Sequence, residues 1–514
     1  LSGGMKQKLS LAAALVPEPH VLLLDEPTTG VDPVSRREFW DALAHLAADG
    51  LTILVATPYL DEAERCHRVA FMHLGELQQI GTPAELRSTL HVKRLELLTS
   101  DLSKSEEILS QGAGTGEIIS DVQRFGDRLD LLAHDPEEAK SLVNEQMKAA
   151  GISVKNIRVD EPTLENTFVA TLRSIGHEMH DVPFPARHSH KDLIGRTAIG
   201  ADHLTMRFGS FTAVNDLRIE VKYGEIYGLL GANGAGKTTT IKMLCGLLDP
   251  TEGEVQLAGA SRAESLRSQA VRERIGYMSQ KFSLYDDLTI QENLEFFAGV
   301  YGVPENERVE KREWVLSFSG LEGKQGLITG SLPGGWKQRV AFGAAIMHEP
   351  SVLFLDEPTS GVDPQARRAF WSMINRLADQ GTAILVTTHY LEEAEQCNRL
   401  GLMVAGEFVA EGSPSGVQGR QTGHLLEFIV DQPQKAADLL KAGSDRWRVS
   451  LFGNRLHIFT DDGAQQAIAR TRATLEAHGV RVLDARLGRF SLEDVFISVV
   501  ERARQQGKVT SEDD

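Results

Sequence analysis

Residues in the second half of the chain have the types and spacing needed to hold a phosphate chain. Residues 231–238 read Gly-Ala-Asn-Gly-Ala-Gly-Lys-Thr and match the pattern GxxxxGK[ST]. Glycines in this pattern let backbone N–H groups wrap a phosphate chain at a helix N-terminus, where the helix dipole favours anions. Lys237 would reach the β- and γ-phosphates, and the hydroxyl of Thr238 would ligate Mg²⁺. The pattern therefore predicts a nucleotide-binding loop between a strand and a helix.

A second group of candidate residues follows two apolar segments further along the chain. Residues 352–355 form a continuous apolar run, typical of a strand buried on both faces of a parallel sheet, and the run ends in Asp356 and Glu357. Open α/β sheets place their ligands at such carboxyl ends. Asp356 could hold Mg²⁺ through water, and Glu357 could polarise the water that attacks in phosphoryl transfer. His389 ends another apolar segment and could hydrogen-bond the γ-phosphate, although a single histidine there is more often only a polar cap.

The elements that must position these residues occur twice. Residues 1–83 match residues 332–414 without gaps, and residues 163–168 match residues 491–496. The chain is therefore a tandem duplication of a large domain with its tail, not a short solenoid repeat. The second copy begins near Ala198, roughly 130 residues before its match to the start of the chain. By that comparison we expect an N-terminally truncated chain whose first copy lacks its own glycine loop.

Composition limits the classes of protein that remain. The 514 residues include 54 Lys and Arg against 72 Asp and Glu, and the net charge of −18 disfavours a protein that mainly grips nucleic acid. Three cysteines do not form a disulfide framework and fit a reducing compartment. No apolar run approaches the ~18 residues that a membrane span needs. The repeated Trp40 and Trp371, and the repeated Cys66 and Cys397, are interpreted as core residues.

The duplication divides the chain into predicted parts. Residues 173–197 carry Pro, Gly and polar residues without a sustained period and are predicted to be a linker. Four histidines in it are interpreted as solvated, because their spacing fixes no coordination geometry: His177, His180, His188 and His190. The predicted domains are 1–88, the C-terminal part of a first nucleotide-binding domain; 89–172, an accessory α/β domain; 198–420, a complete second nucleotide-binding domain; 421–505, a second accessory α/β domain; and 506–514, a disordered tail.

The order of these motifs resembles the ATP-binding cassette (ABC) ATPases. The glycine loop is followed by Gln280, then by the helix start at 332–336, then by the acid pair and then by His389. The resemblance implies an α/β fold of P-loop NTPase cassettes, each with a RecA-like parallel sheet and a helical subdomain, followed by a small α/β accessory domain. It implies ATP and Mg²⁺ as cofactors, with Glu357, His389, Gln280 and Lys237 as catalytic residues.

The same resemblance implies which residues bind the cofactors. Phe208 would stack on adenine, and Mg²⁺ would be held by Thr238, Gln280 and Asp356. ABC domains dimerise head to tail, so each ATP would lie between the glycine loop of one copy and the signature of the other. The implied nucleotide-binding residues are Phe208, Gly231, Asn233, Gly234, Ala235, Gly236, Lys237, Thr238, Thr239 and Asp363 of the second copy, with Ser2, Gly3, Gly4 and Asp32 of the first.

The two ATP sites of such a pair would differ. The site built on the second glycine loop matches the family pattern throughout, whereas the other site departs from it twice. Pro333 replaces the signature serine and removes a hydroxyl and a backbone N–H, and Pro58 replaces the histidine that the second copy has at His389. We expect one hydrolysing site and one degenerate site, the latter built from Asp25, Glu26, Pro58, Pro333, Gly334 and Gly335.

The tails behind the cassettes resemble the C-terminal extensions of ATPases from ABC-2-type exporters. This resemblance implies separate ABC-2-type transmembrane permease subunits as partners, pairing of the two cassettes within the chain, and a place at the cytoplasmic face of a bacterial inner membrane. No direct nucleic-acid contact is expected. A different class, a tandem cassette ATPase acting on ribosomes, is disfavoured because the join between the copies is an α/β tail with a linker rather than a long charged helix. A binding-only scaffold is disfavoured by the intact Lys237, Glu357 and His389.

Overall fold

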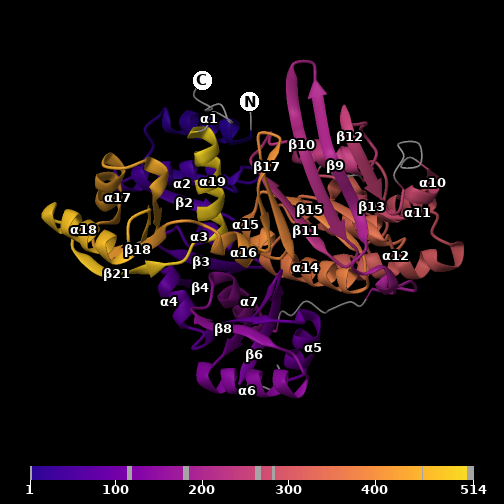
Figure 1. Cartoon of the computed structure of the whole chain (residues 1–514), viewed down its shortest axis with the longest axis horizontal. Coiled ribbons are helices and arrows are strands. Elements are labelled where there is room, and N and C mark those ends of the chain that lie inside the picture. The colour runs from indigo at the N-terminus through magenta and orange to yellow at the C-terminus, as the bar shows by residue number, and fades with distance from the viewer. Residues whose placement is uncertain are drawn as a thin grey trace. The chain divides into compact units, whose positions relative to one another are not determined.

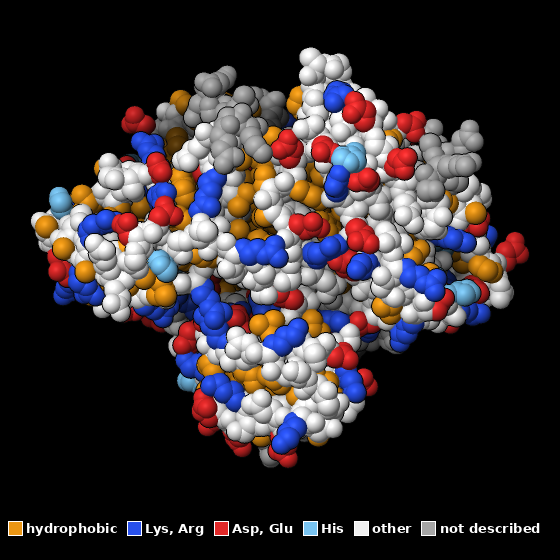
Figure 2. All heavy atoms as spheres, viewed as in Figure 1, with side chains coloured by type: hydrophobic (Ala, Val, Ile, Leu, Met, Phe, Trp, Pro, Cys, Tyr) orange, Lys and Arg blue, Asp and Glu red, His pale blue; other side chains and the backbone are white. Residues whose placement is uncertain are grey.

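The computed structural model describes residues 3–112, 118–176, 184–260, 268–280, 284–453 and 455–505. The chain divides into two compact units, which are described separately. One unit contains residues 179–413, and the other contains residues 1–178 together with residues 414–514. In Figure 1 the indigo N-terminal segments and the yellow C-terminal segments belong to the same unit. Acidic and basic side chains are interspersed over the face of each unit that Figure 2 shows.

The unit of residues 179–413 is built on a six-stranded sheet in the order β13-β14-β15-β11-β16-β17. The first five strands are parallel, and β17 pairs antiparallel with β16. Strands β11, β14 and β15 are apolar along almost their whole length and buried at every position, as expected for central strands of a parallel sheet. The strands are β11 (Ile226–Gly231), β13 (Ile275–Met278), β14 (Val352–Asp356), β15 (Ala383–Thr388), β16 (Arg399–Val404) and β17 (Glu407–Gly412).

A second, antiparallel sheet in this unit has the order β10-β9-β12. Its strands are β9 (Thr197–Phe208), β10 (Phe211–Lys222) and β12 (Glu252–Leu257). Ile199 and Val214 of this sheet share one hydrophobic core with Leu229 and Phe354 of the six-stranded sheet. Helix α8 (Lys237–Leu244), which contributes Ile241 to the same core, begins directly after the glycine loop.

The other elements in the described part of this unit are helices and 3₁₀ turns. The close approach of α12 to α13 depends on Gly343, because a Cβ atom there would lie 2.5 Å from the Val315 side chain. The helices are α10 (Gln269–Arg272), α11 (Ile290–Val300), α12 (Glu305–Ser319), α13 (Gly334–Ile346), α14 (Pro364–Asp379) and α15 (Leu391–Ala394), with the 3₁₀ turns η1 (Lys191–Leu193) and η2 (Thr329–Ser331). The prediction of an α/β cassette with a parallel sheet and a helical subdomain is confirmed.

Part of the segment predicted to be a linker packs on this unit. Phe184 meets Trp314 edge to face with ring centroids 4.6 Å apart, and Lys311 donates to the carbonyl of Pro185. The backbone N–H groups of Arg187 and His188 both donate to Glu349. His177 and His180 lie outside the described residues. Among the residues that the structure does describe, no cluster of His, Cys, Asp or Glu could hold a metal ion.

The other unit contains the first copy, whose strands form two separate pairs, β1-β2 and β3-β4. In the second copy β11 lies between β15 and β16, the counterparts of β2 and β3. Leu23 and Leu54, on β1 and β2, are 70% and 65% exposed. The elements of this copy are α1 (Gly3–Leu15), β1 (Val21–Asp25), α2 (Pro33–Ala48), β2 (Thr52–Ala56), α3 (Leu60–Ala63), β3 (Val69–His73), β4 (Glu76–Gly81) and α4 (Pro83–Ser88).

Each accessory domain has the βαββαβ arrangement of a ferredoxin-like fold, with strand orders β6-β7-β5-β8 and β19-β20-β18-β21. All strand pairs in both sheets are antiparallel. The first domain contains β5 (Lys93–Thr99), α5 (Leu102–Gly112), β6 (Ile119–Phe125), β7 (Arg128–Ala133), α6 (Pro136–Ala149), β8 (Val154–Asp160) and α7 (Leu164–Ser174). Helix α16 (Pro414–Gly419) precedes the second domain, which contains β18 (His424–Val430), α17 (Pro433–Ala442), η3 (Arg446–Arg448), β19 (Val449–Phe452), β20 (Arg455–Thr460), α18 (Ala464–Ala477), β21 (Val482–Gly488) and α19 (Leu492–Gln505).

The repeated S/T-L-E-x-x-F segments begin the last helix of each accessory domain. Thr163 and Asn166 form a reciprocal capping box on α7, and Ser491 and Asp494 exchange the corresponding hydrogen bonds on α19. Helix α7 extends to Ser174, two residues beyond the predicted domain end at 172. The predicted tail, 506–514, lies outside the described residues.

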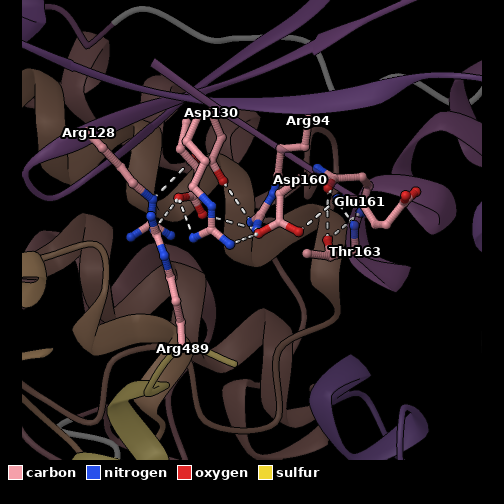
Figure 3. A network of polar contacts seen from close by, with 10 residues as sticks. Arg94, Arg128, Asp130, Asp160, Glu161, Thr163 and Arg489 are labelled. Carbon is pink, nitrogen blue, oxygen red and sulfur yellow. Dashed lines mark hydrogen bonds and ion pairs between the residues drawn. The ribbon is translucent and has the colours of Figure 1, made fainter. Parts of the chain in front are cut away.

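A network of ion pairs crosses the sheet of the first accessory domain, as Figure 3 shows. Arg94 lies 3.1 Å from Asp130 and 3.4 Å from Asp160, and Arg128 donates to Asp130 at 3.1 Å. Arg489 of the second accessory domain approaches this network, with Nη1 3.7 Å from a carboxylate oxygen of Glu96. The two accessory domains therefore meet at a charged surface within one unit.

Candidate functional site

The glycine loop turns sharply from β11 into α8, and two of its glycines are required by their surroundings. Gly236 has φ of 103°, and a Cβ atom there would lie 2.4 Å from the carbonyl oxygen of Ala213. A Cβ atom on Gly231 would lie 2.5 Å from the carbonyl oxygen of Met403. The loop therefore exposes backbone at the N-terminus of α8, where N–H groups and the helix dipole attract anions.

The polar residues of the loop lie around the position that an anion bound to these N–H groups would occupy. Lys237 is buried, and its Nζ donates to the carbonyls of Gly231 at 2.7 Å and Ala232 at 3.0 Å. Asn233 and Thr238 are exposed, and Thr239 is half-buried. The lysine is therefore held against the loop by its own backbone, with its charge beside the glycine turn.

The acid pair at the end of β14 is buried among polar partners. Asp356 and Glu357 are 4% and 6% exposed. Gln280 Nε2 donates to Glu357 Oε2 at 2.8 Å, and His389 Nδ1 lies 2.9 Å from Glu357 Oε1. The hydroxyl of Thr387, on the neighbouring strand β15, donates to Asp356. The parallel sheet thus brings Gln280 and His389 to the acid pair of Asp356 and Glu357, although these three segments are far apart in the sequence.

The two acids have opposite pKa shifts. Burial raises the pKa of Asp356, and the neighbouring charge of Glu357 adds to this increase, against the hydroxyl of Thr387. Burial also tends to raise the pKa of Glu357, but the contacts with His389 and Gln280 and the charge of Lys237 together outweigh burial, so that the pKa lies below its ordinary value. Glu357 is therefore ionised at neutral pH and can accept a proton from, or polarise, a water molecule beside Oε1 or Oε2.

The segments that flank the acid pair place further predicted residues at helix starts. Asp363 caps α14, accepting from the backbone N–H of Ala366 at 2.9 Å. Pro333 occupies the N-cap position of α13 and makes no side-chain cap, so the start of α13 lacks the hydrogen bond that a serine could supply there. Gly334 and Gly335 open this helix, and a Cβ atom on Gly335 would lie 3.6 Å from the carbonyl oxygen of Gly361.

An exposed aromatic pair lies at the turn between β9 and β10. Phe208, the residue predicted to stack on adenine, is 51% exposed. It pairs across the hairpin with Phe211, which is 62% exposed. Phe211 is not among the residues predicted from the sequence, although its position three residues after Phe208 is a signal for a hairpin with two aromatic rings.

The first copy places its counterparts differently. Asp25 and Glu26 are exposed, and the hydroxyl of Thr29 donates to Glu26 at 3.0 Å. Pro58 is half-buried and brings no imidazole to this acid pair. Asp32 is 5% exposed and caps α2, accepting from the backbone N–H groups of Val34 and Ser35. Gly3 and Gly4 begin α1, and Ser2 lies outside the described residues.

The residues of the second copy fit a nucleotide with a divalent cation. A Cβ atom would fill the space at Gly231 and Gly236, so that only glycine leaves the backbone open there. Nδ1 of His389 contacts Glu357, whereas its Nε2 is buried and has no hydrogen-bond partner among the described residues. A bound Mg²⁺ would supply charge neutralisation at the phosphates, and the oxygen donors beside it would be Thr238, Gln280 and Asp356.

Comparison with known proteins identifies relatives of the chain. A sequence model of the ABC transporter family matches residues 1–29 and 214–360. The "Probable multidrug ABC transporter ATP-binding protein YbhF" of Escherichia coli is 44% identical over 421 residues, covering 82% of this chain and 71% of that protein. The "Nod factor export ATP-binding protein I" of Burkholderia lata is 37% identical over 302 residues, covering 58% of this chain and 95% of that protein. A solved ATP-binding subunit of an ABC transporter is 29% identical, covers 44% of this chain and 93% of its own, and has a TM-score of 0.41.

Proposed function

Because the chain belongs to the ATP-binding proteins of ABC transporters, which are ATPases that use ATP with Mg²⁺, we propose that it powers export through separate membrane subunits of the ABC-2 type. No helix among the described residues is long and apolar enough to cross a membrane. The names of the relatives, a multidrug transporter and a Nod factor exporter, support an export function. The protein would then lie at the cytoplasmic face of a bacterial inner membrane, held there by the permease subunits, without direct contact to nucleic acid.

The observation that carries this proposal is the cluster around Glu357. A buried, ionised carboxylate has Gln280 at 2.8 Å and His389 at 2.9 Å, and Asp356 precedes it in the chain. This arrangement holds a general base beside a phosphate-binding loop, which is the requirement for hydrolysis of a nucleoside triphosphate. The signature residues Ser2, Gly3 and Gly4 of the first copy, with Asp32, would complete this site when the two cassettes pair.

The second ATP site is proposed to be degenerate. It would combine Asp25 and Glu26 of the first copy with Pro333, Gly334 and Gly335 of the second. Pro333 cannot cap α13 with a side-chain oxygen, and Pro58 cannot act as the histidine at 389 does. Both losses fall in the same site, and we infer that this site holds nucleotide with slow or no turnover.

Two matched substitutions test the assignment of the sites. In the intact protein, Glu357→Gln removes the general base and should lower the rate of ATP hydrolysis about 100-fold or more. Glu26→Gln makes the same change in the degenerate site and should leave most of the rate. Steady-state release of phosphate measures both rates, and ATP binding should survive in both variants. Equal losses of activity would contradict the proposed asymmetry.

Co-purification tests the partners. We expect to recover the protein in the membrane fraction together with two polytopic subunits. When those subunits are absent, the protein should no longer be found in the membrane fraction. Sedimentation with ribosomes would instead support the ribosome-associated class of tandem cassette ATPases and would contradict the export function.

A further inference from the structure

A buried glutamate lies at the same position behind the acid pair in both copies. Glu393 lies in α15, Glu62 lies in α3, and each is 1% exposed. A carboxylate at such depth costs several kcal/mol unless hydrogen bonds and opposite charge compensate it. Neither residue belongs to the site described above, so the retention of both in a duplicated chain needs a physical reason.

Glu393 connects the segments that carry the catalytic groups. The hydroxyl of Thr359, two residues after Glu357, donates to Glu393 Oε1. Burial raises the pKa of Glu393, and the charge of Arg367 in the first turns of α14 opposes that increase. Glu393 itself lies four residues after His389, on the helix that follows β15. One side chain therefore holds the loop after the general base and lies beside the start of α14, close in sequence to the histidine.

Glu62 makes the corresponding contacts in the first copy. The hydroxyl of Thr28 donates to Glu62 Oε1, and the hydroxyl of Thr57 donates to Oε2 at 2.8 Å. Arg36 Nη1, on α2, lies 3.7 Å from Glu62 Oε1. These three partners match Thr359, Thr388 and Arg367 in the duplicated sequence. The two copies differ in the residue beside this network, which is Pro58 in the first copy and His389 in the second.

The loop that Glu393 holds has a backbone that needs support. Glu357 has φ of 53°, a left-handed conformation that costs a non-glycine residue about 1–3 kcal/mol. The contact between His389 Nδ1 and Glu357 Oε1, at 2.9 Å, joins that loop to the segment on which Glu393 lies. A shift of Thr359 relative to α15 would therefore change the geometry of this contact directly.

We propose that Glu393 is a positioning residue for ATP hydrolysis, which fixes the loop of Glu357 against the segment of His389. This inference rests on the proposed function, since it assumes hydrolysis at the site of the second copy. In the first copy Glu62 has the same packing role without a histidine to position. The chain thus contains its own control, because a purely structural role predicts equal effects in both copies and a positioning role predicts unequal ones.

The test compares Glu393→Gln with Glu62→Gln in the whole chain. Glu393→Gln should lower kcat for ATP hydrolysis about 10- to 100-fold, the size of effect that a misplacement of about 1 Å produces, with KM for ATP changed less than about twofold. Glu62→Gln should leave kcat within about twofold of the unmodified protein. Thermal unfolding measured on both variants should show similar losses of stability, since both lose a buried charge in the same surroundings.

A second pair of variants keeps the test decisive if a buried glutamine disturbs folding. Thr359→Val removes the hydroxyl donor and should reduce kcat, Thr359→Ser should restore it, and Thr28→Val should have little effect. Equal changes of kcat in the two copies, or a change in KM alone, would overturn the positioning role. An unmodified protein without ATPase activity would overturn the proposed function as well, and the two failures are therefore distinguishable.

Discussion

The neighbouring strand imposes the backbone conformation of the glutamate in each acid pair. The backbone N–H of Glu357 donates to the carbonyl of Thr387 on β15 at 3.0 Å, and that of Glu26 donates to Ala56 on β2 at 2.8 Å. Both residues then leave their strands with positive φ, 53° and 43°. The strain is therefore a property of the strand end, and it occurs in both copies although only one has a histidine beside the acid.

His348 gives a prediction for the dependence of stability on pH. Its ring stacks on Tyr301 with centroids 4.0 Å apart, and Nε2 donates to the carbonyl of Ile275 at 3.0 Å. Nδ1 is buried without a hydrogen-bond partner among the described residues. Burial lowers the pKa of His348 to about 4 from its ordinary 6.5. The neutral ring is therefore the form that the folded unit accepts.

Between pH 6.5 and 4 the unfolded chain binds a proton at this histidine and the folded chain does not. The free energy of unfolding should therefore fall as the pH falls through this window, by about 3 kcal/mol in total for this group. Denaturant titrations at pH 7 and pH 4.5 measure the difference. In a His348→Gln variant, which can still donate to Ile275, the difference should shrink, and an unchanged difference would contradict the prediction.

At the scale of an element, two glycines of the glycine loop allow two effects of a substitution, backbone strain and steric collision, to be measured separately. Gly234 and Gly236 both have positive φ, 80° and 103°, but only at Gly236 would a Cβ atom collide, 2.4 Å from the carbonyl of Ala213. Gly234→Ala should cost only the backbone strain, about 1–2 kcal/mol. Gly236→Ala should cost more and should displace the start of α8. Denaturant unfolding and the Kd for ATP measure both, and equal losses of stability would contradict the role given to the collision.

Sequence patterns predict the structure best where a single local segment determines it. The spacing of Gly231, Gly236 and Lys237 predicts a strand, a loop and a helix, and the structure contains β11, the loop and α8 in that order. Trp40 and Trp371 were predicted to be core residues, and their exposures of 7% and 2% confirm this. Local periodicity is sufficient in such cases, because the residues that decide the structure are neighbours in the sequence.

Features that depend on distant pairings could not be predicted. The alternating strands and helices of the tails indicated an α/β domain, but the order β6-β7-β5-β8 depends on strand pairs that no local pattern specifies. Glu393 lies in a segment that repeats in both copies, yet an acid in a short helix is more often solvated than buried. Cys397 is fully buried as predicted, whereas Cys66 is only partly buried between two smaller cores.

At the scale of the whole chain, the accessory domain of the second copy belongs to the same compact unit as the first copy. Lys441 on α17 lies 2.7 Å from Asp41 on α2, and Arg37 donates to the carbonyl of Trp447 at 3.0 Å. The C-terminal end of the chain therefore folds onto the element that follows Asp32. The first copy and the second accessory domain are therefore held together by contacts between their own surfaces. The histidine-containing segment that joins the copies is not needed for this.

Arg65 makes a bidentate ion pair across this docking surface. Its Nη2 lies 2.6 and 2.8 Å from the two carboxylate oxygens of Glu493, and its guanidinium lies over the ring of Phe452 at 4.3 Å. Both side chains are largely buried, at 8% and 19% exposure, so that solvent screens the pair weakly. Arg65→Glu should therefore destabilise the docking by about 3 kcal/mol, because a buried carboxylate would lose its partner and face another.

Hydrogen exchange of α19 measures this effect without any assumption about activity. Arg65→Glu should raise the exchange rate of α19, and the double variant Arg65→Glu with Glu493→Arg should restore protection, since it rebuilds an ion pair of opposite polarity. The exposed pair of Lys8 and Glu38 supplies the control: its side chains are 43% and 47% exposed, and Lys8→Glu should change stability by less than about 1 kcal/mol. If α19 exchanges at the same rate in all variants, the accessory domain does not depend on this ion pair to hold the first copy, and the docking comes from its other contacts, such as those of Lys441 and Arg37.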